Sequence, residues 1–192
     1  MGLPINKLVI ATNKNDILKR VINTGCYKPL QVEHTVSPSM DIQVASNFER
    51  LIFDICSHNS DKVLELMKDL EEKGEFKLKE EEINKIKNNF LSESLSESET
   101  KSVISEIYYN QKTLVDPHTA IGIGAIKKVS LEGNTVILAT AHPSKFSEVV
   151  KNETNVLPEL PENLKKILVK EEKYIKLPNN LKNIQKYIVE KI

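Results

Sequence analysis

Two short runs of branched apolar residues constrain the fold of this 192-residue chain more than any other feature. They are KLVIAT at 7–12 and TVILAT at 135–140, and a helix start follows each of them. Runs of this length and composition are typical of strands buried within a parallel sheet. Right-handed crossovers bring the carboxyl ends of such strands to a common side. We therefore expect an α/β fold with an open, mostly parallel sheet flanked by helices, and Thr12 and Thr140 at the same edge of that sheet.

Helical periodicity dominates the chain between the two runs. Apolar side chains recur at helical spacing after Asn13 or Asn15, either of which can cap the first helix, and Gly25 is expected to end it. Asp116 followed by Pro117 has the composition of another helix start. The sequence therefore predicts three parts: an α/β portion at 1–50, a mainly helical insertion or lobe at 51–115, and a second α/β portion at 116–192 that ends in helices.

Charge and composition exclude several classes of protein. Basic and acidic residues balance at 27 each, so no global field attracts nucleic acid or a membrane surface. The sequence has no run of about 18 apolar residues for a transmembrane helix, and residues 1–12 lack the features of a signal peptide. Cys26 and Cys56 are far apart, as expected of free thiols in a reducing compartment. We expect a cytoplasmic protein that binds neither nucleic acid nor membranes.

One arginine draws attention because the chain is so rich in lysine. Only Arg20 and Arg50 among the 27 basic residues are arginines. A guanidinium binds phosphate or carboxylate through paired hydrogen bonds, which a lysine does not form. Ser46 and Asn47, close to Arg50, have small side chains that form hydrogen bonds. Two interpretations stay open: these three residues bind an anion, or Ser46 or Asn47 caps a helix that begins here.

A second group of candidate residues surrounds the end of the run at 135–140. Thr140 would lie at the carboxyl end of a strand, where open α/β sheets bind their ligands, although its hydroxyl could also cap the next helix. His142 could exchange protons near neutral pH or hold the turn. The rival interpretation is a metal site formed by Asp116, His118, His142 and His34. The spacing of these residues does not support that site, so no metal is expected.

Three ordered motifs give the chain a family resemblance. The motifs are SPSMDI at 37–42 followed by SNFERL at 46–51, then DPHTAIG at 116–122, and finally ATAHPSKF at 139–146. Together with both ends of the chain, they resemble the carboxyl-terminal part of threonine synthases, which are lyases that use pyridoxal phosphate (PLP). The resemblance implies the C-terminal portion of a fold-type II PLP enzyme. It also implies a parent protein that converts O-phospho-L-homoserine and water to L-threonine and phosphate.

The same resemblance implies roles for individual residues. Thr140 matches the threonine that lies against the pyridine nitrogen of PLP, although Ala139 replaces the serine of the family motif. The other residues that the resemblance places at the cofactor pocket are His142, Asp116 and His118. The resemblance implies that Ser46, Asn47 and Arg50 recognise the phosphate of O-phospho-L-homoserine. It does not indicate which of the three touches the phosphate.

The resemblance also indicates what this sequence does not contain. In the family, the Schiff-base lysine and the glycine-rich loop for the cofactor phosphate lie upstream of the matching region, so we assign no catalytic residue in this chain. The only G-x-G, Gly122-Ile123-Gly124, lies in a helical pattern without further glycines. We interpret the chain as a fragment that is inactive alone, from a monomeric or homodimeric parent. The alternatives are a non-catalytic scaffold chain and a related phospho-amino-acid lyase.

Overall fold

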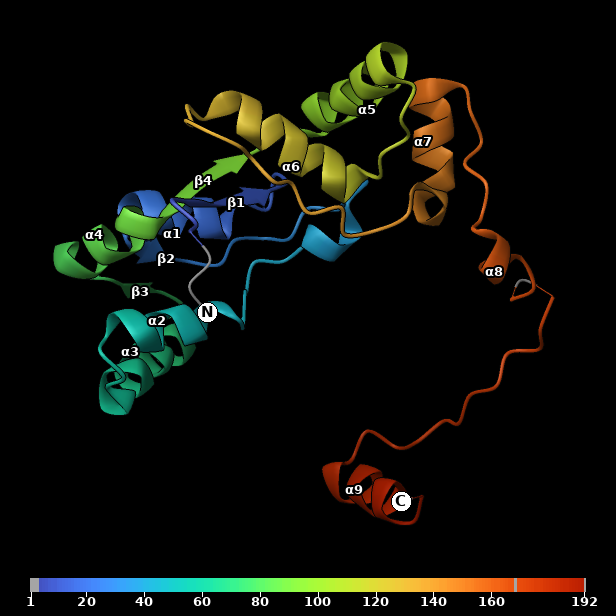
Figure 1. The fold of residues 1–192 in the computed structure, drawn as a ribbon. Helices are drawn as coiled ribbons and strands as arrows, with labels where there is room; N and C mark the ends of the chain where they lie inside the picture. Colours follow the sequence, from blue (N-terminus) through green and yellow to red (C-terminus); the bar gives the residue numbers. More distant parts are fainter. Residues whose placement is uncertain (1–3, 168, 192) are drawn as a thin grey trace. The chain divides into compact units, whose positions relative to one another are not determined.

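A computed structural model describes residues 4–167 and 169–191, and the chain forms two compact units (Figure 1). The first unit ends at Pro158 and the second begins at Glu159. The second unit contains α8 (Glu162–Lys165) and α9 (Leu181–Val189), in agreement with the helices expected at the end of the chain.

A pair of parallel strands lies at the centre of the first unit. Strand β1 (Leu8–Thr12) pairs in parallel with β4 (Phe90–Ser94), and the register places Thr12 opposite Ser94 at the carboxyl ends. A parallel pair needs a long crossover, which the helical residues between the strands supply. The predicted parallel strand at 7–12 is confirmed, and so is the α/β class. A second, antiparallel pair joins β2 (Cys26–Tyr27) to β3 (Phe76–Lys77).

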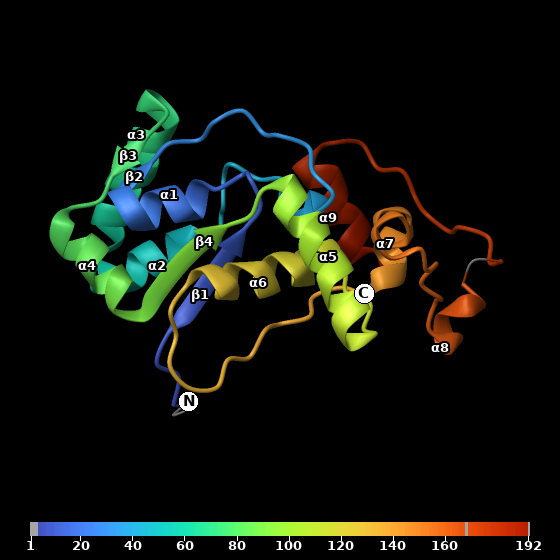
Figure 2. The same ribbon diagram turned by 90° about the horizontal axis from the view of Figure 1, so that it is seen from above.

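Helices cover both faces of the β1–β4 pair, with α1 on one face and α6 on the other (Figure 2). Successive side chains of a strand point to opposite faces. Ile10 therefore packs against a core that includes α1 and α2, while Ala11 packs against a second core formed by α5 and α6. The described helices of this unit are α1 (Ile17–Thr24), α2 (Phe48–Ile55), α3 (Ser60–Lys73), α4 (Glu80–Asn89), α5 (Glu97–Gln111), α6 (Pro117–Lys128) and α7 (Ser147–Thr154), with 3-10 turns η1 (Pro38–Met40) and η2 (Pro143–Phe146).

Two predicted helix boundaries follow their sequence signals. Gly25 ends α1 in the left-handed region, at φ 76°, where its hydrogen side chain costs no steric energy. Asp116 caps α6, and Pro117 occupies the first helical position. Strand β4 lies inside the range 51–115, so this range contributes to the sheet as well as supplying helices. The three-part division of the chain stays a prediction.

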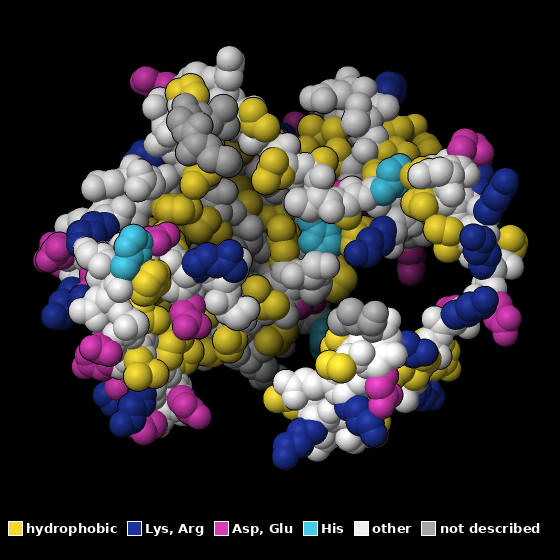
Figure 3. All heavy atoms as spheres, turned by 60° about the horizontal axis from the view of Figure 1, so that its bottom comes forward, with side chains coloured by type: hydrophobic (Ala, Val, Ile, Leu, Met, Phe, Trp, Pro, Cys, Tyr) yellow, Lys and Arg dark blue, Asp and Glu magenta, His cyan; other side chains and the backbone are white. Residues whose placement is uncertain are grey.

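The expected strand at 135–140 does not form, and this expectation was wrong. Residues 134–140 have no regular secondary structure, and Val136 and Leu138 are 85% and 76% exposed. A strand needs a neighbour for its backbone hydrogen bonds, and no strand of the described residues pairs with this run. Thr140 therefore does not share a sheet edge with Thr12. Apolar side chains, yellow in Figure 3, reach the surface in many places on the face drawn there.

The close approach of α5 and α6 depends on Gly124. A Cβ atom on Gly124 would overlap the Leu95 side chain and would lie 3.2 Å from Cγ2 of Val103. We expect Gly124→Ala to lower the free energy of unfolding by about 1–3 kcal/mol, because overpacking a close contact forces side chains apart. Urea unfolding followed by circular dichroism measures the change.

Gly122 provides the matched control in the same helix. A Cβ there would approach only Ile137, 3.0 Å away, in the exposed run that can yield. Gly122→Ala should therefore be neutral, or should stabilise the helix by up to about 1 kcal/mol. Equal losses of stability in the two variants would contradict the packing role of Gly124.

Candidate functional site

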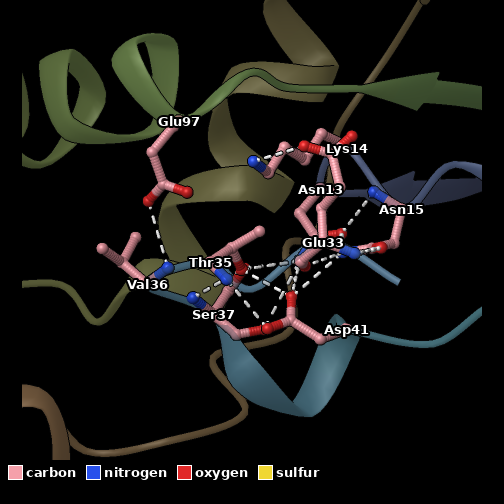
Figure 4. A network of polar contacts seen from close by, with 9 residues as sticks. All are labelled: Asn13, Lys14, Asn15, Glu33, Thr35, Val36, Ser37, Asp41 and Glu97. Atoms are coloured by element: carbon pink, nitrogen blue, oxygen red, sulfur yellow. Dashed lines mark hydrogen bonds and ion pairs between the residues drawn. The ribbon is translucent and has the colours of Figure 1, made fainter. Parts of the chain in front are cut away.

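A network of hydrogen-bonding side chains lies at the carboxyl end of β1 (Figure 4). We call it the Asp41 network, and it consists of Asn13, Asn15, Thr35, Ser37 and Asp41. The Asn13 amide nitrogen lies 2.9 Å from Thr35 Oγ1, 3.0 Å from Ser37 Oγ and 2.7 Å from Asp41 Oδ1. Asn13, Asn15 and Ser37 are almost fully buried. The network therefore ties the SPSMDI motif to the end of the parallel strand.

Asp41 is the shared acceptor of this network. Its Oδ1 accepts hydrogen bonds from the Asn15 amide at 3.1 Å and from the Thr35 hydroxyl at 2.7 Å, and its Oδ2 accepts from the Thr35 N–H at 2.9 Å. Asn15 also exchanges two hydrogen bonds with the backbone of Glu33, both 2.8 Å long. All these donors are neutral, so the carboxylate is stabilised by hydrogen bonds rather than by an ion pair.

Charged side chains border the network. Lys14 forms a 2.7 Å ion pair with Glu33, and its hydrogen bond to that carboxylate raises the pKa of Lys14 above its usual value. Glu97, the first residue of α5, accepts a 3.0 Å hydrogen bond from the Val36 N–H. The loop before SPSMDI is therefore attached to the strand end on one side and to α5 on the other.

The predicted anion-binding residues lie on and just before α2. Ser46, Asn47 and Arg50 are exposed, and Asn47 precedes α2 without a capping hydrogen bond from its side chain. Among the described residues, the Arg50 guanidinium has no hydrogen-bond or ion-pair partner. The capping interpretation of Asn47 is therefore not supported by the geometry. The segment is anchored through Ala45, whose N–H donates a 2.7 Å hydrogen bond to the Tyr27 hydroxyl.

The other arginine has a structural role. Arg20 donates to Asp16 Oδ1 at 2.9 Å, to the Lys28 carbonyl at 2.8 Å and to Gln43 Oε1 at 2.8 Å. These hydrogen bonds use all three nitrogen atoms of the Arg20 guanidinium. Of the two arginines, Arg50 is the one that is free to bind an anion.

A second buried cluster lies at the start of α6. Asp116 is 1% exposed, and its Oδ1 accepts hydrogen bonds from His118 Nδ1 at 2.9 Å and from the His118 N–H at 2.9 Å. Its Oδ2 accepts from the Thr119 hydroxyl. The carboxylate therefore orients the imidazole of His118, as carboxylates orient histidines in many functional sites.

An aromatic contact joins two of the three motifs. The ring of Phe146 lies against His118, with 4.8 Å between the centroids. His142 caps η2, and its Nδ1 lies 2.7 Å from Ser144 Oγ. Thr140 is exposed. The structure thus brings DPHTAIG and ATAHPSKF together through Phe146, a residue that the sequence interpretation did not single out.

The first motif reaches the same region through an apolar contact. Met40 of η1 packs against the core cluster that contains Ala120 and Ile121 of α6. No hydrogen bond of the described residues joins the Asp41 network to the Asp116 cluster. In the part of the chain that is described, no group of three His, Cys, Asp or Glu residues could hold a metal ion, and no helix is long and apolar enough to cross a membrane.

Comparisons with known proteins agree on one family. The family model "Threonine synthase, C-terminal" matches residues 119–188. The threonine synthase of Pseudomonas aeruginosa is 39% identical over 98% of this chain and 41% of its own length, and that of Saccharomyces cerevisiae is 37% identical over 87% of this chain and 38% of its own length. The chain thus spans about two fifths of the length of these curated relatives.

Solved structures give the same result. The PLP-bound threonine synthase from Brucella melitensis has a TM-score of 0.89 and 39% identity, and the match covers 99% of this chain and 41% of that one. The yeast threonine synthase has a TM-score of 0.82 and 33% identity, over 99% of this chain and 43% of that one. The chain therefore has the fold of the carboxyl-terminal part of a PLP enzyme. It belongs with the threonine synthase family, as the counterpart of the C-terminal part of its members.

Proposed function

We propose that this chain supplies the C-terminal part of a threonine synthase, which converts O-phospho-L-homoserine and water to L-threonine and phosphate with PLP. The observation that carries the proposal is the 39% identity to a PLP-bound threonine synthase across 99% of this chain, with a TM-score of 0.89. The match includes all three motifs. A cytoplasmic location, a small-molecule substrate and a monomeric or homodimeric assembly belong to the same proposal.

Residues of the ATAHPSKF and DPHTAIG motifs fit one side of a PLP pocket. Thr140 is exposed, and its hydroxyl makes no hydrogen bond with the described residues, so it is free to donate to a pyridine nitrogen. Phe146 of this motif is half-buried and lies against the buried ring of His118. When bound, PLP delocalises the negative charge that develops on the substrate carbon. A neutral hydroxyl partner leaves its ring nitrogen unprotonated, which suits elimination and replacement at the β and γ carbons.

Arg50 is the preferred residue for the substrate phosphate. Its guanidinium is exposed and has no partner among the described residues, whereas Arg20 is fully engaged. The planar guanidinium of arginine can donate paired hydrogen bonds to the oxygens of a phosphate. Ser46 and Asn47 precede Arg50 by one turn of helix or less, so their side chains supply hydrogen bonds for the remaining phosphate oxygens.

A chimera tests the proposal directly. The amino-terminal part of the P. aeruginosa threonine synthase, up to the start of its matching region, would be joined to this chain. We expect the purified chimera to bind PLP and to release phosphate and threonine from O-phospho-L-homoserine. This chain alone should do neither, because in the proposal the lysine that attaches the cofactor lies in the part of the relatives that it does not cover.

Three results would count against the proposal. A folded chimera that binds PLP but forms no threonine would favour a non-catalytic chain. Turnover of a different phosphorylated amino acid would favour a related lyase. The proposal places the lysine that attaches the cofactor in the part of the relatives that this chain does not cover. Borohydride fixation of PLP at one defined lysine of this chain alone would contradict that placement. The intact P. aeruginosa enzyme, prepared in parallel, is the positive control.

A further inference from the structure

A stack of aromatic rings attaches the first residue of α2 to the β2–β3 pair. The ring of Tyr27 lies nearly parallel to that of Phe48, with 5.6 Å between the centroids and 9° between the planes. It also stacks on Phe76, at 4.8 Å and 4°. All three residues are buried, and stacked aromatic pairs contribute binding energy beyond the area that they bury. Because Tyr27 belongs to β2 and Phe76 to β3, the stack fixes the start of α2 against this pair of strands.

Tyr27 also holds the residue that precedes Ser46 and Asn47. Its hydroxyl accepts a 2.7 Å hydrogen bond from the N–H of Ala45, which is 4% exposed. The Ala45 carbonyl in turn accepts a 3.0 Å hydrogen bond from the Phe48 N–H. The Tyr27 side chain therefore contacts the chain on both sides of Ser46 and Asn47, by its hydroxyl at Ala45 and by its ring at Phe48.

The three residues that we assign to the substrate phosphate have no side-chain anchor of their own. The side chains of Ser46, Asn47 and Arg50 are exposed and form no hydrogen bond or ion pair with the residues that the structure describes. Their positions therefore depend on the backbone that carries them. Groups that are already in place before a ligand arrives lose less conformational freedom when they bind it.

We propose that Tyr27 is a positioning residue for phosphate recognition: its hydroxyl and its ring hold the segment that carries Ser46, Asn47 and Arg50 in the arrangement that binds a phosphate group. The inference rests on the proposed function, which assigns the substrate phosphate to these three residues. Tyr27 is 2% exposed, so it acts through the backbone of the segment and not by contact with the phosphate. A tyrosine that only stabilised the core would change the stability of the chain and leave its affinity for phosphate unchanged.

Nuclear magnetic resonance of the nitrogen-15-labelled full chain tests the proposal, with inorganic phosphate as the probe. The chain has two arginines, so Arg50→Lys identifies the Nε–H signal of Arg50 by its loss. We expect this signal to shift saturably with phosphate, whereas the signal of Arg20, whose guanidinium nitrogens are all engaged, should not. Tyr27→Phe keeps the ring and removes the hydroxyl. It should raise the dissociation constant for phosphate about threefold to tenfold, as expected for the loss of one hydrogen bond, and the Ala45 amide hydrogen should exchange faster with solvent.

Two further variants separate positioning from general stability. Phe48→Leu removes the stacked ring and keeps the hydroxyl, so it should also weaken phosphate binding, and it replaces Tyr27→Phe in the test if that variant does not fold. Ile104→Val removes a methyl group from the other core of this unit, where Ile104 is fully buried. It should lower stability but leave the dissociation constant for phosphate within about twofold of the unmodified chain.

Three results would overturn the role of Tyr27. They are an unchanged dissociation constant in folded Tyr27→Phe, an equal weakening in Ile104→Val, and no saturable shift of the Arg50 signal in the unmodified chain. None of these measurements uses PLP or turnover. An inactive chimera would therefore count against the proposed function without altering the titration, and a titration without an Arg50 shift would overturn this inference even if the chimera is active.

Discussion

Replacement of Asp41 by alanine should lower the free energy of unfolding by about 3–5 kcal/mol, which is a large part of the stability of a typical domain. Asp41 accepts hydrogen bonds from the amides of Asn13 and Asn15 and from both the hydroxyl and the N–H of Thr35. In the alanine variant the Thr35 N–H loses the one acceptor that the described residues offer it, at a cost of about 1–3 kcal/mol. The Asn13 and Asn15 amides keep other acceptors, and each loses a hydrogen bond worth about 0.5–1.5 kcal/mol. Urea unfolding of the purified chain, followed by circular dichroism, measures the loss.

Two further variants make this result specific. Asp41→Asn keeps the shape and one acceptor oxygen, so it should lose less stability than Asp41→Ala. Glu132 is an exposed acidic residue, and Glu132→Ala should change stability by no more than about 0.5 kcal/mol. If Asp41→Ala is as stable as Glu132→Ala, the network does not hold the SPSMDI motif in place.

Thr140→Val in the chimera should slow threonine formation roughly tenfold or more. Valine keeps the shape of threonine but removes the hydroxyl that we assign to the pyridine nitrogen of PLP. Loss of that hydrogen bond costs about 1–3 kcal/mol, and about 1.4 kcal/mol corresponds to a factor of ten in rate. Steady-state release of threonine and titration with PLP measure the two effects.

Thr140→Ser is the control because it retains the hydroxyl, and it should keep most of the activity. Neither variant should destabilise this chain on its own, since Thr140 is exposed and outside regular secondary structure. Wild-type turnover together with wild-type PLP affinity in Thr140→Val would remove Thr140 from the cofactor site.

The parts of the fold that the sequence predicted well depend on local signals. The apolar run at 7–12, the glycine at position 25 and the Asp116–Pro117 pair each determine the conformation of their own segment. The run at 135–140 has the same local signal as the run at 7–12, yet it forms no strand. A strand also requires hydrogen-bonding neighbours, and β1 finds one in β4 whereas 135–140 has none among the described residues. Local propensity cannot report whether such a neighbour is present.

The candidate site shows the same limit. Asn13 and Asn15 have the composition of helix caps, but their side chains bind Asp41, more than 20 residues away in sequence. Phe146 resembles an ordinary apolar residue, and only the fold places it against His118. The Asp116 cap was predictable because its partners lie two and three residues away. Contacts between distant segments carry no comparable pattern in a single sequence.

The exposed run at 135–140 has a consequence for handling this protein. TVILAT combines branched apolar side chains with no charge and no proline, which is the composition of segments that assemble into intermolecular β-structure. In most folded proteins such a segment is buried or guarded by a charged neighbour. Here Val136 and Leu138 are open to solvent, so we expect the isolated chain to self-associate through this run as its concentration rises.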